Sequence, residues 1–300
     1  MRRKKTLMIL CFLCLTVTFA ACGFNKALTP ENSDINTPNK QNISVNSPEA
    51  QQASAPTLSG KLVIEGSTSM QKIFQGLSDT FTAKNPKVSI EYIADGSSAG
   101  INAVIADTAN IGTSSREVKE EERSQGLEVI TIAEDAIALI VHPDNGVTDL
   151  TREQVAQIYK KEITNWKDVG GKDAPIVVVA RDAASGTREA FESIFGVKDA
   201  VMADQEAAKT GEVITVIAQN PNAIGYISLA YSGNTVKNLN IDGMRATEEN
   251  VINGTYTIKR PFNIVTKGQP DALEKAFIDF IFSEEGAQII SKEAVPVKRQ

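Results

Sequence analysis

Turns rich in hydroxyl side chains follow four predicted strands, and each could bind the oxygen atoms of an anion. These turns are residues 66–69 after the strand at 61–65, 96–98 after 88–93, 113–116 after 109–112, and 181–187 after 175–180. A helix that begins at such a turn presents unpaired backbone N–H groups and about half a positive charge, and Ser or Thr adds a hydroxyl donor. Because oxyanions bind at helix starts of this kind, the pattern predicts an oxyanion site.

The elements around these turns alternate between strand and helix. The strands are rich in β-branched residues, and apolar residues at helical spacing follow the first, second and fourth turns, at 70–81, 101–105 and 190–195. This alternation predicts an α/β fold. In an open α/β sheet, turns at the carboxyl ends of strands lie along one edge, where ligands bind, so several of them can meet in one crevice.

Arg181 supplies the one full positive charge of this group. Its planar guanidinium can donate to two oxygen atoms at once, as tetrahedral anions require. The structural alternative is a surface salt bridge with Asp182 or Glu189. The hydroxyl-rich sequence at 185–187 favours ligand binding.

Composition and charge reduce the number of function classes that the chain could belong to. The chain has 300 residues, of which 42% are hydrophobic and 23% charged, as expected for one large or two medium globular domains. Its 31 basic and 37 acidic residues give a net charge of −6, and four of the basic residues lie at 2–5. So acidic a chain is not expected to bind nucleic acid. It has one histidine and no nucleotide-binding motif, so we expect no metal site and no cofactor.

The first 57 residues are typical of an export signal and a tether. Basic residues at 2–5, an apolar stretch at 6–19 and small residues before Cys22 predict a signal peptide at 1–21. The region around Cys22 resembles a bacterial lipobox, which implies that Cys22 is acylated and anchors the chain at the extracytoplasmic face of the cell membrane. An ordinary secreted protein is the alternative. Residues 22–57 are rich in Asn, Ser, Pro and Gln and form the predicted tether.

Several motifs together resemble the phosphate-binding lipoproteins that serve Pst-type ABC importers. They are GSTS at 66–69, GSS at 96–98, IGTSSR at 111–116, ITNW at 163–166 and R-x-x-x-SGT at 181–187. The resemblance implies a two-lobed Venus-flytrap fold, similar to type II periplasmic binding proteins, with a two-segment hinge. It implies a binding protein rather than an enzyme, which captures inorganic phosphate and delivers it to membrane permease subunits. The ligand residues implied are Ser67, Thr68, Ser69, Ser97, Ser115, Arg181, Ser185, Gly186 and Thr187.

The chain departs from this family at two positions. Some members carry an aspartate at the position of Ser115, where it accepts the proton of hydrogen phosphate and so excludes sulfate. Ala183 occupies a second position where the family often has an acidic residue. Candidate acceptors elsewhere in this chain are Asp95, Asp135 and Asp182.

The lobes are expected to be formed from three segments. We predict that residues 58–140 and 225–300 form the first lobe and 141–224 the second. The apolar run at 136–141 is the predicted first crossing between them, and the strand at 223–228 is the predicted return. Trp166 is expected in the core of the second lobe. We expect a monomer.

Three other functions stay open from the sequence. The same fold could bind sulfate, molybdate or another tetrahedral oxyanion. The G-x-S-x-G pattern at 96–100 is also found in serine hydrolases, with Ser98 as nucleophile and His142 as the one available base. A phosphate sensor or adhesin without a transporter is the third.

We predict that Arg181→Ala weakens phosphate binding at least about tenfold, because the substitution removes a charge-assisted donor. The melting temperature of the ligand-free protein should stay nearly unchanged. Calorimetric titration and thermal denaturation test both statements. A loss of stability without a loss of affinity would give Arg181 a structural role instead.

Overall fold

The computed structural model describes residues 57–299. The predicted signal peptide, Cys22 and all of the tether except Thr57 lie outside the described residues. Within 57–299, no helix is long and apolar enough to cross a membrane.

The first half of the structure is a sheet covered by helices on both faces. Side chains of α1 and α8, among them Phe74 and Phe277, pack with Ile64 of β1 in one buried cluster. Ile101 and Val104 of α2 pack with Val265 in another. The elements of this half are β1 (Gly60–Gly66), α1 (Gln71–Lys84), β2 (Val88–Ala94), α2 (Ser97–Ile105), β3 (Ile111–Ser114), α3 (Glu120–Arg123), β11 (Lys259–Lys267), α8 (Ala272–Ile281), α9 (Glu284–Ile290) and β12 (Val295–Pro296).

The second half has its own buried cluster. Trp166 belongs to it, as the sequence predicts, and its indole N–H donates to the carbonyl oxygen of Asn222 at 2.9 Å. The elements of this half are β5 (Asp149–Leu150), α4 (Arg152–Tyr159), the 3-10 helix η1 (Trp166–Val169), β6 (Val177–Arg181), α5 (Gly186–Phe195), β7 (Gln205–Ala207), α6 (Thr210–Gln219), β8 (Ala223–Ser228), the 3-10 helix η2 (Leu229–Tyr231), β9 (Lys237–Asn238), β10 (Asn240–Ile241) and α7 (Glu248–Ile252).

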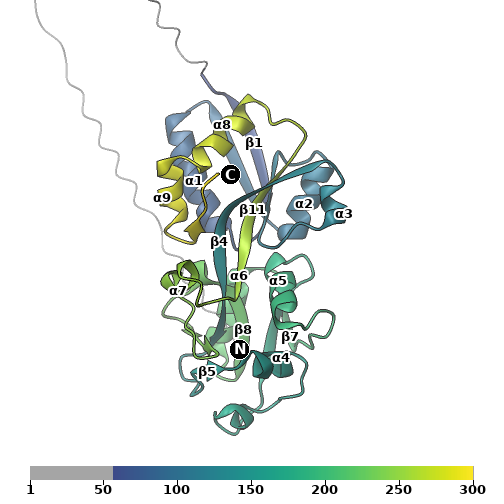
Figure 1. Cartoon of the computed structure of the whole chain (residues 1–300), viewed down its shortest axis with the longest axis vertical. Coiled ribbons are helices and arrows are strands. Elements are labelled where there is room, and N and C mark those ends of the chain that lie inside the picture. The colour runs from purple at the N-terminus through teal and green to yellow at the C-terminus, as the bar shows by residue number, and fades with distance from the viewer. Residues whose placement is uncertain (1–56, 300) are drawn as a thin grey trace, which may run out of the picture. The chain divides into compact units, whose positions relative to one another are not determined.

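One strand, β4 (Leu127–Val141), belongs to both halves. Nine of its first ten residues pair antiparallel with β11, with a register shift that leaves Ile132 out, and its last five pair antiparallel with β8. The sheet therefore runs without a break in the order β2-β1-β3-β11-β4-β8-β6-β7. Figure 1 shows β4 passing from the upper group of elements to the lower one beside β11. The predicted α/β, two-lobed fold is confirmed.

The strand predicted to return to the first lobe, at 223–228, does not cross. It is β8, which lies between β4 and β6. All its residues are buried, and its apolar side chains belong to the cluster of the second half. Residues from Val236 to Ile258 also pack in that cluster, and Phe262 of β11 is the next core residue of the first half. This packing differs from the lobe boundaries predicted at 140/141 and 224/225. From the packing, we propose that the second lobe comprises residues 136–258.

Two glycines allow the turns after β1 and β2 to approach other backbone closely. Gly66 has φ +143°, and a Cβ there would lie 2.1 Å from the carbonyl oxygen of Thr113. Gly96 has φ +107°, and a Cβ there would lie 2.6 Å from the carbonyl oxygen of Ala184 in the second half. Neither position has room for a side chain, and the φ values favour glycine.

We predict that Gly100→Ala destabilises the fold by about 1–3 kcal/mol or more, because overpacking forces backbone to move. Gly100 faces β1 from α2, and an added Cβ would lie 2.2 Å from the carbonyl oxygen of Glu65. Denaturant unfolding measures the change.

Gly211→Ala in α6 is the matched control, because nothing lies within 4 Å of its added Cβ. That change should stabilise the helix by up to about 1 kcal/mol. Equal effects from the two substitutions would contradict the packing described.

Candidate functional site

The four predicted turns meet where the two halves face each other. Three belong to the first half and follow β1, β2 and β3, and the fourth follows β6 of the second half and leads into α5. Helices α1, α2 and α5 begin at the first, second and fourth turns, whereas α3 begins only after a gap from the third. All nine predicted ligand residues are buried.

The hydroxyls of the first half form a connected group. Ser67 Oγ donates to Ser115 Oγ at 2.8 Å, and the backbone N–H of Ser115 donates to Ser97 Oγ at 3.0 Å. No side chain caps α1 or α2. The serines of these two turns are therefore not simply helix caps, which is the usual structural reason for a serine at a helix start. Ser185 does cap α5, accepting from the N–H of Arg188 at 3.2 Å.

Contacts between the halves close the site. Ser69 Oγ lies 2.9 Å from Thr187 Oγ1, and the backbone N–H of Ser98 donates to the carbonyl oxygen of Ala184 at 3.2 Å. A Cβ on Gly186 would lie 2.2 Å from Ser97 Oγ, so only glycine fits here in this arrangement. The structure is therefore a closed form, with polar groups of both halves in contact.

Arg181 is buried, and no described residue forms an ion pair with it. Its guanidinium donates to the carbonyl oxygens of Ala207 and Ala208, at 3.1 and 2.7 Å, and to Thr68 Oγ1 at 3.0 Å. Burial lowers the pKa of Arg181, opposed by the charge of Asp182, yet an arginine stays protonated at neutral pH.

No carboxylate of the described residues lies within 4 Å of this guanidinium, which excludes the surface salt bridge considered from the sequence. The group is a buried positive charge surrounded by hydroxyls.

A second guanidinium at the site was missed from the sequence, and the expectation of one positive charge was wrong. Arg260, at the start of β11, donates to Ser69 Oγ and to the carbonyl oxygen of Ser115, both at 3.1 Å. It also forms a buried ion pair with Asp135 of β4 at 2.9 Å. Burial raises the pKa of Asp135 to about 6, opposed by Arg260, whose guanidinium favours the ionised carboxylate. Arg260 is thus already neutralised, in contrast to Arg181.

Thr210 was also missed. It is the first residue of α6, and its hydroxyl lies 3.1 Å from Thr68 Oγ1 and accepts from Arg181 Nη1 at 3.3 Å. The sequence signal was a further Thr at a helix start, but it follows a strand of only three residues, which the sequence pattern does not reveal.

The three candidate proton acceptors lie in different surroundings. Asp95 is exposed, and Asp135 is bound to Arg260 and to the hydroxyl of Ser228. Asp182 has a buried Oδ1 without a hydrogen-bond partner, and burial raises its pKa, opposed by Arg181. By contrast, the hydroxyl of Ser115 lies within hydrogen-bond distance of Ser67 Oγ and Ser97 Oγ, at 2.8 and 3.3 Å.

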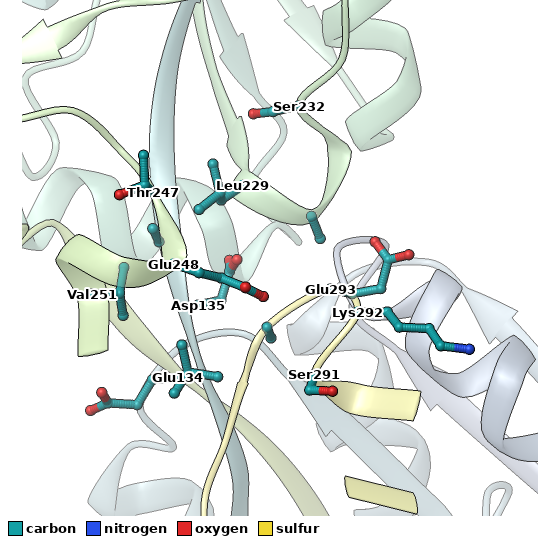
Figure 2. Close-up of a pocket in the computed structure, with 14 residues that line it drawn as sticks. Glu134, Asp135, Leu229, Ser232, Thr247, Glu248, Val251, Ser291, Lys292 and Glu293 are labelled. Carbon is teal, nitrogen blue, oxygen red and sulfur yellow. The ribbon is translucent and has the colours of Figure 1, made fainter. Parts of the chain in front are cut away.

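A separate cavity of about 360 Å³ lies beside β4. Figure 2 shows it between Glu248 and Val251 of α7 and the segment Ser291 to Glu293, with Asp135 of β4 lining it. None of the nine predicted residues lines it. Its charged side chains are mostly carboxylates, so it does not suit an anion.

Ser98 and His142 are not hydrogen-bonded to each other, as the nucleophile and base of a serine hydrolase would be. Ser98 Oγ accepts from Arg116 Nη2 at 3.1 Å, whereas Nδ1 of His142 accepts from the backbone N–H of Asp144 at 3.1 Å. Within residues 57–299, no group of three or more His, Cys, Asp or Glu side chains is arranged to hold a metal ion.

Comparison with known proteins agrees with this geometry. A family model described as a PBP superfamily domain matches residues 50–285. The phosphate-binding protein PstS of Bacillus subtilis is 30% identical over 293 residues, which cover 95% of this chain and 91% of that protein. The chain belongs to the PstS family. The PstS of Borreliella burgdorferi is 35% identical over 77% of this chain and 87% of that protein.

Solved structures show the same fold. A Clostridium perfringens protein, named for a substrate-binding role in phosphate ABC transport and crystallised with bound phosphate, has a TM-score of 0.77 and 43% identity, covering 80% of this chain and all of that one. An ABC-type phosphate transport receptor of Vibrio cholerae has a TM-score of 0.67 and 34% identity, covering 79% of this chain and 100% of that one. The resemblance inferred from the motifs to the PstS family is therefore confirmed. Members of this family are substrate-binding proteins rather than enzymes.

We predict that Asp135→Leu destabilises the fold by about 3–5 kcal/mol, because it leaves the buried charge of Arg260 unpaired. Denaturant unfolding at pH 7 measures this change.

The double variant Asp135→Leu with Arg260→Met should recover most of the lost stability, since an apolar pair can replace a buried ion pair. A double variant less stable than the single one would contradict this description of the pair.

Proposed function

We propose that this chain captures inorganic phosphate between its two lobes and delivers it to the permease of an ABC importer. The observation that carries the proposal is the guanidinium of Arg181, buried at the junction of the lobes without a carboxylate partner in the described part of the chain. A buried unpaired charge is unfavourable, and a bound anion would neutralise it. The names of the relatives and the bound phosphate of the Clostridium perfringens structure support phosphate as that anion.

The proposed ligand residues are the nine predicted from the sequence. Ser67, Thr68 and Ser69 would donate from the start of α1, and Ser97 and Ser115 from the next two turns. Arg181, Ser185, Gly186 and Thr187 would donate from the second lobe. The contacts between hydroxyls described above support this role, because each hydroxyl can turn its proton from a neighbour to a ligand oxygen.

The affinity expected for such a site is micromolar or tighter. Phosphate has five heavy atoms, and a ceiling of about 1.5 kcal/mol per atom gives about −7.5 kcal/mol, or a dissociation constant on the order of micromolar. Closure removes water from the site, which strengthens each charge-assisted hydrogen bond. A charged site with many donors can therefore exceed this figure.

We further propose that the chain acts at the extracytoplasmic face of the membrane as a monomer. Acylation of Cys22 would hold it there, and the tether at 22–57 would let the binding lobes reach the permease subunits. The predicted signal peptide and the PstS relatives support this location. The chain would catalyse no reaction, since its buried charges suit binding and Ser98 is hydrogen-bonded to Arg116.

Another tetrahedral oxyanion is the second candidate ligand, because Ser115 stands where some family members have a proton-accepting aspartate. Hydroxyls can accept the proton of hydrogen phosphate, but they can also donate to sulfate. The site would then separate the two anions less strongly than a carboxylate does.

Calorimetric titration tests the proposal, and we expect phosphate to bind with a dissociation constant of about one micromolar or below. Competition with sulfate across a pH series measures the selectivity. Millimolar affinity for phosphate would remove the importer function, and preferred binding of sulfate would favour the second candidate.

The Gly186→Ala variant tests lobe closure in the same titration. Its Cβ would meet Ser97 Oγ only when the lobes are closed, so binding should be lost while the ligand-free melting temperature is kept. Unchanged affinity in this variant would contradict binding by lobe closure.

A further inference from the structure

Arg116 links the third turn of the site to the opposite lobe. Its side chain is only 2% exposed, and its guanidinium is held within the first lobe by both carboxylate oxygens of Glu122, at 2.7 and 2.9 Å. The same guanidinium donates to Ser98 Oγ at the start of α2. Arg116 therefore has a fixed position on the first lobe that does not depend on the second.

Glu189 reaches this guanidinium from the second lobe. It lies in the first turn of α5, and its Oε2 is 2.8 Å from Arg116 Nε. Its other oxygen lies 3.3 Å from Lys119 Nζ, also of the first lobe. Figure 1 shows α2 and α3 above α5 on the side of the molecule away from α7 and α9. One carboxylate thus joins two cations across the junction of the lobes.

The charges are arranged so that this contact can break and form again. If Glu189 moves away, Arg116 keeps the bidentate partner Glu122, so no buried charge loses its counter-charge. Glu189 and Lys119 have side chains that are 36% and 41% exposed, so water can solvate both when they separate. The contact between Arg116 and Glu189 is a close ion contact but not an aligned hydrogen bond. Its contribution is therefore moderate and reversible.

We propose that Glu189 forms an ion pair with Arg116 and Lys119 when the lobes close, and that this latch slows release of the bound anion. The inference rests on the proposed function. Glu189 is a positioning residue, because it acts through α5, whose first residues carry Gly186 and Thr187. Holding the first turn of this helix against the first lobe keeps those donors in place.

A different contact holds the lobes together near the start of α1. Lys72 Nζ donates to the carbonyl oxygen of Ala230 at 2.7 Å and lies 4.5 Å from the ring of Tyr231. Tyr231 in turn donates to the carbonyl oxygen of Thr68 at 2.9 Å. This contact stays when Glu189 is changed, so loss of the latch should speed release without abolishing binding.

The test is the rate of release of radiolabelled phosphate into excess unlabelled phosphate, measured with the whole chain. Glu189→Gln should speed release about three- to tenfold, with the association rate changed less than about twofold, since short-range contacts act mainly on dissociation. Raising the salt concentration should speed release from the original chain but have little effect on the variant. The ligand-free melting temperature should be unchanged.

Two further variants complete the design. Glu121→Gln is the matched control, because Glu121 is an exposed acid beside Arg116 on the first lobe and its carboxylate has no ion pair with the second. It should release phosphate at the original rate. Glu189→Asp keeps the charge and should recover part of the slow release.

Equal release rates for Glu189→Gln and the original chain would overturn the latch while phosphate binding stands. The same acceleration in Glu121→Gln would also overturn it, because the effect would then follow from net charge. If neither the original chain nor any variant bound phosphate, the proposed function would fail, and the latch with it.

Discussion

The site depends on one buried positive charge that no carboxylate of residues 57–299 neutralises. Arg181 is held by backbone carbonyls and hydroxyls, which fix its direction but carry no full negative charge. In a closed, dry junction such a charge interacts strongly with any anion that enters. The hydroxyls around it then select an anion of tetrahedral shape, because they donate from turns on opposite sides of the site. Charge supplies the attraction, and the two-lobed fold supplies the geometry.

Two further buried arginines, Arg260 and Arg116, lie beside this site and have different roles. Arg260 has the same chemistry as Arg181 but is paired with Asp135, so its guanidinium serves to hold Ser69 and the turn of Ser115. The pair lies where β4 and β11 run side by side between the lobes. The ion pair therefore stabilises the turns of Ser69 and Ser115 without adding net charge to the site. Arg116 differs from both Arg181 and Arg260, because it pairs with one carboxylate from its own lobe and one from the other.

The sequence was informative where a local pattern determines the structure. The strands that lead into the first, second and fourth hydroxyl-rich turns were recognisable from β-branched residues followed by apolar residues at helical spacing. The family motifs named the residues that the structure brings together. The lobe boundary was harder, because β8 is buried on both faces and its apolar run resembles a crossing strand as much as a central one. Arg260 was missed because an arginine in a strand is usually exposed, and its partner is 125 residues away in the chain. Such long-range pairing leaves no local signal.

The fifteen-residue strand β4 has a consequence for how the chain unfolds. Most of it completes the sheet of one lobe, and the remainder completes the sheet of the other, so neither sheet is whole without it. Melting of one lobe would strip the shared strand of its partners and expose core side chains of the other. We therefore expect the two lobes to unfold as a single cooperative unit, with the heat-denaturation behaviour of one domain.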